Sequence, residues 1–282
     1  MTNCIFRFSV CSFVFALFAS NSANAQYYYK DILSNQQLNK EFFILKNKQI
    51  KDIKIKSFEG NDEPSEGFFC EKKINKGYSQ SEMLSKSNIT GQSLLVTDYN
   101  AKGLVIETTN TTPTSSNIVK FDYDDQGHLS MITTETTGGD DSSGIVETHQ
   151  YFYDKNGNLE KMLRKKNNVL IATITFVKDG KGNVIEEDAA GKSNDKKYYY
   201  YYDDKNRLTD VVHFNEVARK LLPDYMFEYD TLNQKKQMIS VDESGRNYFI
   251  WRYAYNDQEL PEIQKCFSKE KKLLGTIQYE YY

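Results

Sequence analysis

The sequence predicts an all-β fold, an antiparallel meander of about eight hairpins that forms one curled or partly rolled sheet. Three observations predict it. A phrase of two aromatic residues, an aspartate and a polar turn recurs along the chain, and the residues before each turn alternate between apolar and polar. The 282 residues also contain 21 Tyr and 17 Phe but only four Pro, a composition typical of strands.

The recurring phrase is clearest in "FDYDDQGHL" at 121–129 and "YFYDKNGNL" at 151–159. An aspartate or asparagine caps each predicted turn, and a Gly or Asn takes the left-handed position. Each copy therefore predicts one hairpin. The second aromatic residue of each copy, or its equivalent, stands at positions 99, 123, 153, 178, 202, 229, 255 and 281, a period of 24 to 30 residues. We call the residues at these eight positions the anchors.

Strand side chains alternate between two faces, which explains most of the run "KKYYYYYDDKNRL" at 196–208. The anchors and the residues two and four before them are apolar in nearly every copy, so they form the predicted inner face. The intervening residues are mostly polar. On this interpretation Tyr198, Tyr200 and Tyr202 are ordinary inner residues, and only Tyr199 and Tyr201 need another explanation.

The chain divides into three predicted parts. Residues 1–25 contain a single charged residue, an apolar stretch too short to span a bilayer, and an A-x-A site, which indicates a secretory signal peptide. We expect an exported protein, periplasmic or extracellular, with no membrane span after cleavage. Residues 26–94 predict a capping region with irregular strands near 47–58 and 67–74 and a short helix at 34–46. Residues 95–282 form the repeat domain.

The phrase "YDxxGxL", matched in full at 123–129 and 153–159, resembles the YD repeat, also called the RHS repeat. The chain is similar to the plainer secreted YD-like proteins of Bacteroidetes-type bacteria, for which the resemblance implies no activity. Large members of the family form a shell around a toxic C-terminal segment. This chain has too few hairpins for a shell and ends within a repeat, so the resemblance implies the sheet and not the toxin role.

Residues that could carry catalysis or bind a metal are sparse. The three histidines lie in no recognised catalytic motif, and the many aspartates lie in predicted turns. Residues 154–158 resemble the start of a calcium loop but lack its glycine and its distant glutamate. We therefore expect no enzyme, metal or cofactor. The near-balanced charge, 36 Lys+Arg against 39 Asp+Glu, argues against a nucleic-acid partner.

One candidate binding surface remains on the outer face. Phe152, Val177, Tyr199 and Tyr201 break the polar pattern of that face and predict an apolar patch that binds a glycan or an envelope or secreted protein. The alternative is that residues 26–94 fold over the patch and bury it.

Two further features concern pairing. Cys70 and Cys266 remain after export and could form a disulfide or be two buried thiols. The last strand, near 277–282, has an edge that predicts a concentration-dependent dimer. Two alternatives to a binding protein stay open: a structural scaffold or remnant of an RHS-type toxin system, and a hydrolase whose site the sequence disguises.

Overall fold

The computed structural model describes residues 27–138, 144–191, 197–215, 218–242 and 245–282. The predicted signal peptide therefore lies outside the described residues. One helix and eighteen strands make up this part of the chain. They are α2 (Tyr29–Asn47), β1 (Asp52–Glu59), β2 (Phe69–Ile74), β3 (Gln80–Ser87), β4 (Gly91–Tyr99), β5 (Val105–Thr111), β6 (Ser115–Tyr123), β7 (Leu129–Gly138), β8 (Ile145–Tyr153), β9 (Leu159–Lys166), β10 (Val169–Lys178), β11 (Val184–Gly191), β12 (Lys197–Tyr202), β13 (Leu208–Asn215), β14 (Lys220–Tyr229), β15 (Lys235–Val241), β16 (Tyr248–Tyr255), β17 (Pro261–Phe267) and β18 (Leu273–Tyr281).

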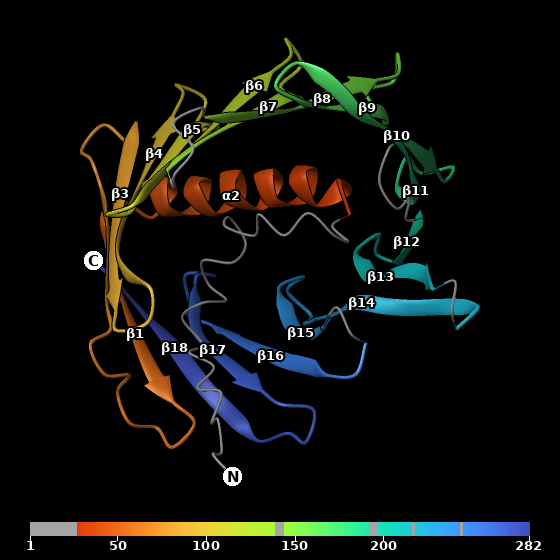
Figure 1. Cartoon of the computed structure of the whole chain (residues 1–282). Helices are drawn as coiled ribbons and strands as arrows, with labels where there is room; N and C mark the ends of the chain where they lie inside the picture. Colours follow the sequence, from red (N-terminus) through yellow and green to blue (C-terminus); the bar gives the residue numbers. More distant parts are fainter. Residues whose placement is uncertain (1–26, 139–143, 192–196, 216–217, 243–244) are drawn as a thin grey trace.

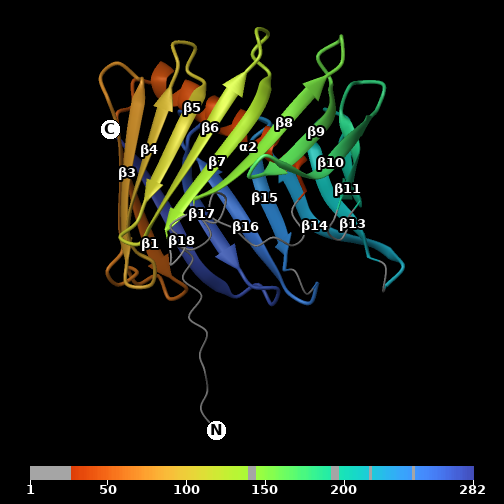
Figure 2. The ribbon, with the colours of Figure 1, turned by 45° about the horizontal axis from the view of Figure 1, so that its top comes forward.

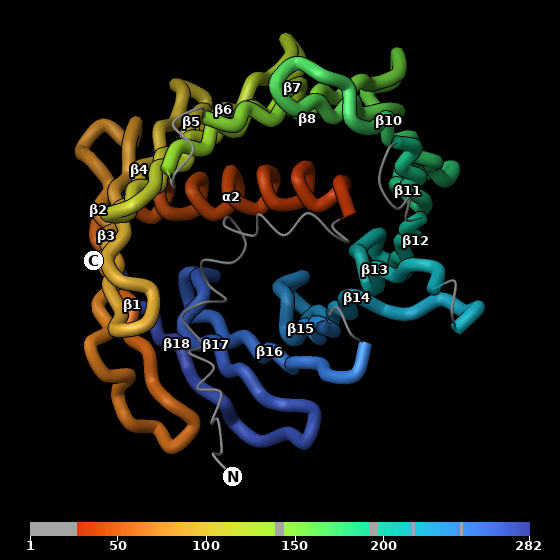
Figure 3. The backbone as a smooth tube through the Cα atoms, viewed as in Figure 1, coloured from red at the N-terminus to blue at the C-terminus, as the bar shows by residue number. Residues whose placement is uncertain are grey.

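The strands form a closed antiparallel barrel. Each strand pairs with the next one along the chain, and β1 closes the ring by pairing with β18 through seven residue pairs, from Ile53 with Tyr281 to Glu59 with Gly275. Figures 1 and 3 show the wall as a single ring, and Figure 2 shows the strands tilted side by side around it. The all-β prediction is confirmed, but the curled or partly rolled sheet of about eight hairpins is wrong.

The repeat did not reveal two features of the closed ring. The expected capping region, residues 26–94, contributes most of β1–β4 (52–99), four wall strands that continue the same meander. The last strand has β17 on one side and β1 on the other. The open edge at 277–282, from which an edge-strand dimer was expected, is therefore absent from the described structure.

The helix α2 lies inside the ring (Figure 1). The prediction of a helix is confirmed, although α2 begins five residues before the expected 34–46 segment. Phe42 stacks on Tyr99 with ring centroids 3.4 Å apart, and the ring of Tyr29 meets that of Tyr200 at 5.3 Å. Eighteen strands enclose more space than wall side chains alone can fill, so the helix and the large aromatic residues together supply the core.

The inner tyrosine ladder is confirmed. Tyr198 and Tyr200 are each only 2% exposed, and both belong to the core cluster around α2. A hydrogen bond explains why the anchor position favours Tyr over Phe. The tyrosine hydroxyl donates to a backbone carbonyl at the start of the preceding strand along the chain. Six such bonds measure 2.5–3.0 Å and join Tyr123 to Val105, Tyr153 to Leu129, Tyr202 to Val184, Tyr229 to Leu208, Tyr255 to Lys235 and Tyr281 to Pro261.

The predicted turns are present as well. In the turn after β8, the Asp154 carboxylate accepts hydrogen bonds from the backbone N–H groups of Asn156 and Asn158. Gly157 takes the left-handed conformation at φ 78°, and Asn206 takes it at φ 66° in the equivalent turn after β12. These bonds account for the repeated aspartates.

Candidate functional site

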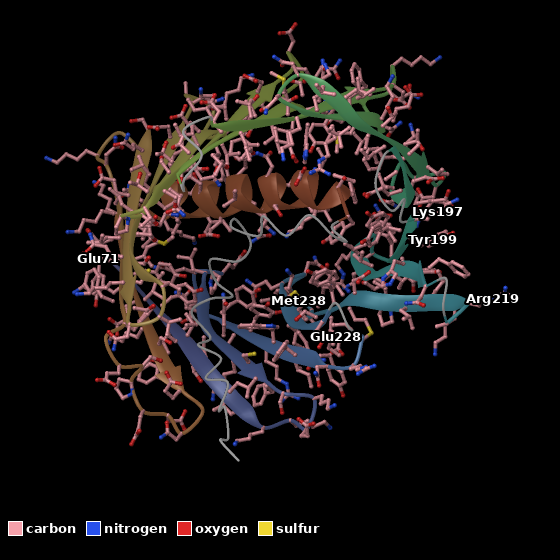
Figure 4. All side chains as sticks on the ribbon, viewed as in Figure 1. Glu71, Lys197, Tyr199, Arg219, Glu228 and Met238 are labelled. Carbon is pink, nitrogen blue, oxygen red and sulfur yellow. The ribbon has the colours of Figure 1, made fainter. Side chains whose placement is uncertain are left out.

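The four residues of the predicted patch all face outward from the wall. Tyr199 lies between the inward residues Tyr198 and Tyr200 on β12, and Figure 4 shows its side chain pointing away from the barrel. Tyr201 is 48% exposed and Val177 47% exposed. Residues 27–94 do not cover them, because α2 lies against the opposite, inner face and β1–β4 form wall elsewhere.

The structure brings three of the four together. Val177 pairs with Glu186, Glu186 with Tyr199, and Tyr199 with Val212. These pairs form one row across β10–β13 that contains two of the predicted residues, Val177 and Tyr199. Tyr201 lies two residues along β12 on the same face. We call Val177, Tyr199, Tyr201 and Val212 the tyrosine platform.

Phe152 does not belong to the tyrosine platform. It lies on β8 opposite Lys161, whose ammonium group is 4.8 Å from the centre of the phenyl ring. Strand β9 separates it from β10, so it does not join the row across β10–β13.

Charged groups frame the tyrosine platform. Lys197 Nζ is 2.6 Å from a carboxylate oxygen of Glu186 and 5.8 Å from the centre of the Tyr199 ring. Asp210 pairs with Tyr201 across β12 and β13. The two outward tyrosines therefore lie among hydrogen-bonding groups of both charges.

A second cluster, which sequence reasoning missed, lies inside the barrel at the N-terminal end of α2. The carboxylate of Glu187, on β11, accepts hydrogen bonds from the backbone N–H groups of Tyr28 and Tyr29, both at 2.8 Å, and from the Tyr200 hydroxyl at 2.7 Å. No side chain of α2 caps its own first turn. Glu187 therefore takes the capping role from the wall, where a carboxylate also interacts favourably with the helix dipole.

Beside Glu187, a buried histidine joins α2 to the wall. His149 Nδ1 donates to Asp31 of the helix at 2.6 Å, and its Nε2 donates to Glu147 of β8 at 3.0 Å. Arg164 donates two hydrogen bonds of 2.9 Å to the Glu147 carboxylate. The Tyr151 hydroxyl donates to Asp31 at 2.7 Å. We call Asp31, Glu147, His149 and Arg164 the helix clamp.

Charge within the helix clamp is set by its own members. Burial disfavours the charged imidazolium, but Asp31 and Glu147 outweigh it and raise the pKa of His149 to about 9. Burial likewise opposes ionisation of Glu147, yet hydrogen bonds from His149 and Arg164 hold its pKa at about 2. Burial raises the pKa of Glu187 to about 7, despite hydrogen bonds that favour its ionised form.

This arrangement suits attachment better than catalysis. An imidazole that stays protonated at neutral pH cannot act as a general base, and both of its nitrogens are already engaged. Sequence reasoning treated His149 as one of three histidines outside any catalytic motif, and it passed over Glu147, Arg164 and Glu187. The signal was there, because each is a charged residue at an inward position of an otherwise apolar ladder.

The predicted cysteine pair and the calcium-like segment belong to neither the tyrosine platform nor the helix clamp. Cys70 on β2 and Cys266 on β17 are buried thiols. Strands β1 and β18 lie between them, three strand spacings of about 4.8 Å each, so the structure does not join them. Within the described ranges, no three His, Cys, Asp or Glu residues form a metal-binding group. The calcium-like segment 154–158 is a hairpin turn in which Lys178 Nζ lies 2.7 Å from Asp154.

Among the described residues, no helix is both long and apolar enough to cross a membrane. No protein-family model matches the chain, and no curated protein matches it either. Similar solved structures include a porin-like protein from Bacteroides uniformis, which is 8% identical with a TM-score of 0.41 over 83% of this chain and 98% of that one.

A porin-like protein from Bacteroides vulgatus is 13% identical with a TM-score of 0.33, over 71% of this chain and 97% of that one. A TcdB2-TccC3-Cdc42 structure is 10% identical with a TM-score of 0.22, over 76% of this chain and only 16% of that chain. Every one of these TM-scores is below 0.5, so none of the likenesses carries an argument about this chain.

The assignment to the YD or RHS repeats is therefore wrong. The strands close into an 18-strand barrel around a helix, and no family model supports the assignment. The reason lies in the phrase itself. It encodes an antiparallel hairpin with an aspartate turn and an inward tyrosine, a local unit that an open sheet and a closed barrel can share.

Proposed function

We propose that the chain is an exported, non-enzymatic binding protein, in the periplasm or outside the cell, that holds a glycan on its tyrosine platform. The observation that carries the proposal is the outward pair Tyr199 and Tyr201. Val212 pairs with Tyr199, and Val177 lies in the same row on the other side of Glu186. The inner ladder uses Tyr198, Tyr200 and Tyr202 for the core, and the rings of Tyr199 and Tyr201 lie outside it.

The chemistry of the tyrosine platform favours a sugar chain. Aromatic rings offer flat apolar faces, and a sugar ring presents C–H groups on its faces and hydroxyl groups at its edges. The Tyr199 and Tyr201 side chains lie on one strand face, where alternate residues project in the same direction. Glu186, Lys197 and Asp210 supply hydrogen-bonding groups at the margin. The predicted protein partner is the second candidate for this surface.

A porin-like role in a membrane, which the names of two neighbours suggest, fits the wall less well. Lys54 of β1, Lys120 of β6 and Arg252 of β16 are exposed and lie within their strands rather than at the ends. A lysine or arginine on a lipid-facing barrel surface costs about 2–4 kcal/mol at the bilayer midplane. The charges support a wall that faces water, and α2 occupies the interior where a channel would run.

Affinity electrophoresis through gels containing xylan, β-glucan or mucin tests the proposal, with mature protein beginning at Gln26. We expect retardation in at least one gel and its loss in a Tyr199→Ala, Tyr201→Ala variant. Tyr248→Ala is the matched control, because Tyr248 is an exposed tyrosine at 37% on β16, away from the platform. Circular dichroism checks that all variants are folded. Equal retardation of the platform variant and the control would refute the proposed site.

A further inference from the structure

An apolar strip lies on the outer wall next to the tyrosine platform. Met226 pairs with Ile239, Ile239 with Ile250, and Ile250 with Phe267, so the four form one row across β14–β17. We call these four residues the aliphatic strip. None of them belongs to the core cluster around α2. Their neighbours in sequence, such as Phe227, face inward, and Figure 4 shows Met238 inside the barrel.

The composition of the aliphatic strip points to a protein partner and not to a glycan. Three of its four residues have no ring. Ile250 faces outward but is only 7% exposed, so the accessible apolar surface of the strip belongs mainly to the other three. Met226, Ile239 and Phe267 are half-buried. A contiguous outward row of large apolar side chains is typical of the centre of a protein interface.

A charged row follows the aliphatic strip two residues further along the strands. Gln237 of β15 pairs in register with Glu228 of β14 on one side and with Arg252 of β16 on the other. Gln237 Nε2 donates to Glu228 at 2.9 Å, and Arg252 Nε donates to Gln237 at 3.3 Å. The acid and the base thus lie on opposite sides of β15, each one strand away from it.

We propose that a second copy of this chain covers the aliphatic strip, around a two-fold axis that lies in the interface and runs along β15. Such an axis exchanges the two sides of β15 while preserving the level along the strands. Ile239 then faces its own counterpart, and Met226 faces Ile250 of the other copy. Phe267, two strands from β15, lies at the edge of the contact, opposite Asp210 of the other copy. At the level of the charged row, Glu228 faces the other copy's Arg252, twice by symmetry.

This self-complementarity is the reason for choosing a second copy over another protein. The charged row runs from Glu228 through Gln237 of β15 to Arg252. It is complementary to itself only when the two-fold axis runs along β15, because each acid then faces a base of the other copy. The strip is short and the outer wall of a barrel is convex, so the interface is at the small, transient end of the range. We expect a dimer that forms at high concentration and dissociates on dilution.

Sedimentation velocity over a concentration series tests the proposal on the mature protein. We expect wild type to show a reversible monomer–dimer equilibrium. Glu228→Arg alone and Arg252→Glu alone each place like charges opposite one another across the axis and should weaken the dimer by about tenfold or more. An equimolar mixture of the two variants should recover wild-type association, because each copy then offers the charge that the other lacks.

The mixture separates an interface from a folding effect, since a defect within either chain would persist in it. Circular dichroism confirms that both variants are folded, and Lys120→Glu serves as a charge-reversal control on distant β6. A wild-type protein that stays monomeric at several hundred micromolar would overturn the proposal. So would a mixture that associates no better than its components. The double variant Tyr199→Ala, Tyr201→Ala keeps the aliphatic strip intact and should dimerise like wild type. The dimer proposal and the glycan proposal can therefore fail separately.

Discussion

Removing the imidazole from the helix clamp should destabilise the protein in a pH-dependent way. In His149→Gln, the neutral amide replaces a charged ring that links Asp31 of α2 to Glu147 of the wall. The His149 side chain is only 17% exposed, so solvent screens these contacts weakly. A wild-type pKa of about 9, against 6.5 for an ordinary histidine, measures how strongly the fold favours the charged form.

The sign and the window follow from linkage. A raised folded-state pKa contributes stability that is fully present below pH 6.5 and is lost as the pH rises through 9. The contribution is about 3 kcal/mol at pH 6, about 2 kcal/mol at pH 7.5 and under about 0.5 kcal/mol at pH 9.5. The difference in unfolding free energy between wild type and His149→Gln should therefore shrink by about 3 kcal/mol between pH 6 and pH 9.5.

Urea unfolding followed by circular dichroism at these three pH values measures the difference. Glu187 also loses stabilisation as the pH rises from 4.5 to 7, because its folded-state pKa is raised to about 7. Both proteins contain Glu187, so its effect cancels in the difference. A gap between wild type and variant that stays constant from pH 6 to pH 9.5 would refute the assignment of a charged His149 to the clamp.

Two further predictions concern the wall. Tyr229→Phe removes the hydroxyl that donates to the Leu208 carbonyl at 2.8 Å and should lower the free energy of unfolding by about 1 kcal/mol; a variant as stable as wild type in urea would contradict it. Cys70 and Cys266 should react with Ellman's reagent only slowly in the native mature protein and should release two equivalents of chromophore in denaturant without prior reduction. Fewer than two equivalents in denaturant would show that the thiols are oxidised.

The sequence predicted what depends on neighbours along the chain. The hairpins, the aspartate turns and the alternation of Tyr198 to Tyr202 all follow from local rules, and all are present. Ring closure did not follow, because pairing of Ile53 with Tyr281 joins the two ends of the chain. Nothing in either segment differs from a strand that stops at a free edge. Local patterns set the hairpin, and only the sum of twist and stagger over eighteen strands decides whether the ends meet.

The same distinction applies to the sites. The outward tyrosines were visible as exceptions to a two-residue period, and three of the four patch residues lie on one outward face across β10–β12. Phe152 lies apart from the other three, because β9 separates its strand, β8, from β10. The helix clamp was not recognised, because Asp31 and His149 are 118 residues apart in sequence and meet only once α2 enters the barrel.

The charged inward residues explain how a barrel of this size can have a packed interior. Eighteen strands leave a lumen too wide for wall side chains, so an apolar helix alone would fill it without a fixed position or direction. Glu187 recognises the N-terminal end of α2 through its free N–H groups, and the clamp binds Asp31 in the first turn. A helix inserted in the opposite direction would bring C-terminal carbonyl groups against Glu187. Repulsion between them would disfavour that orientation, so polar groups set the direction of the helix and aromatic rings supply the packing.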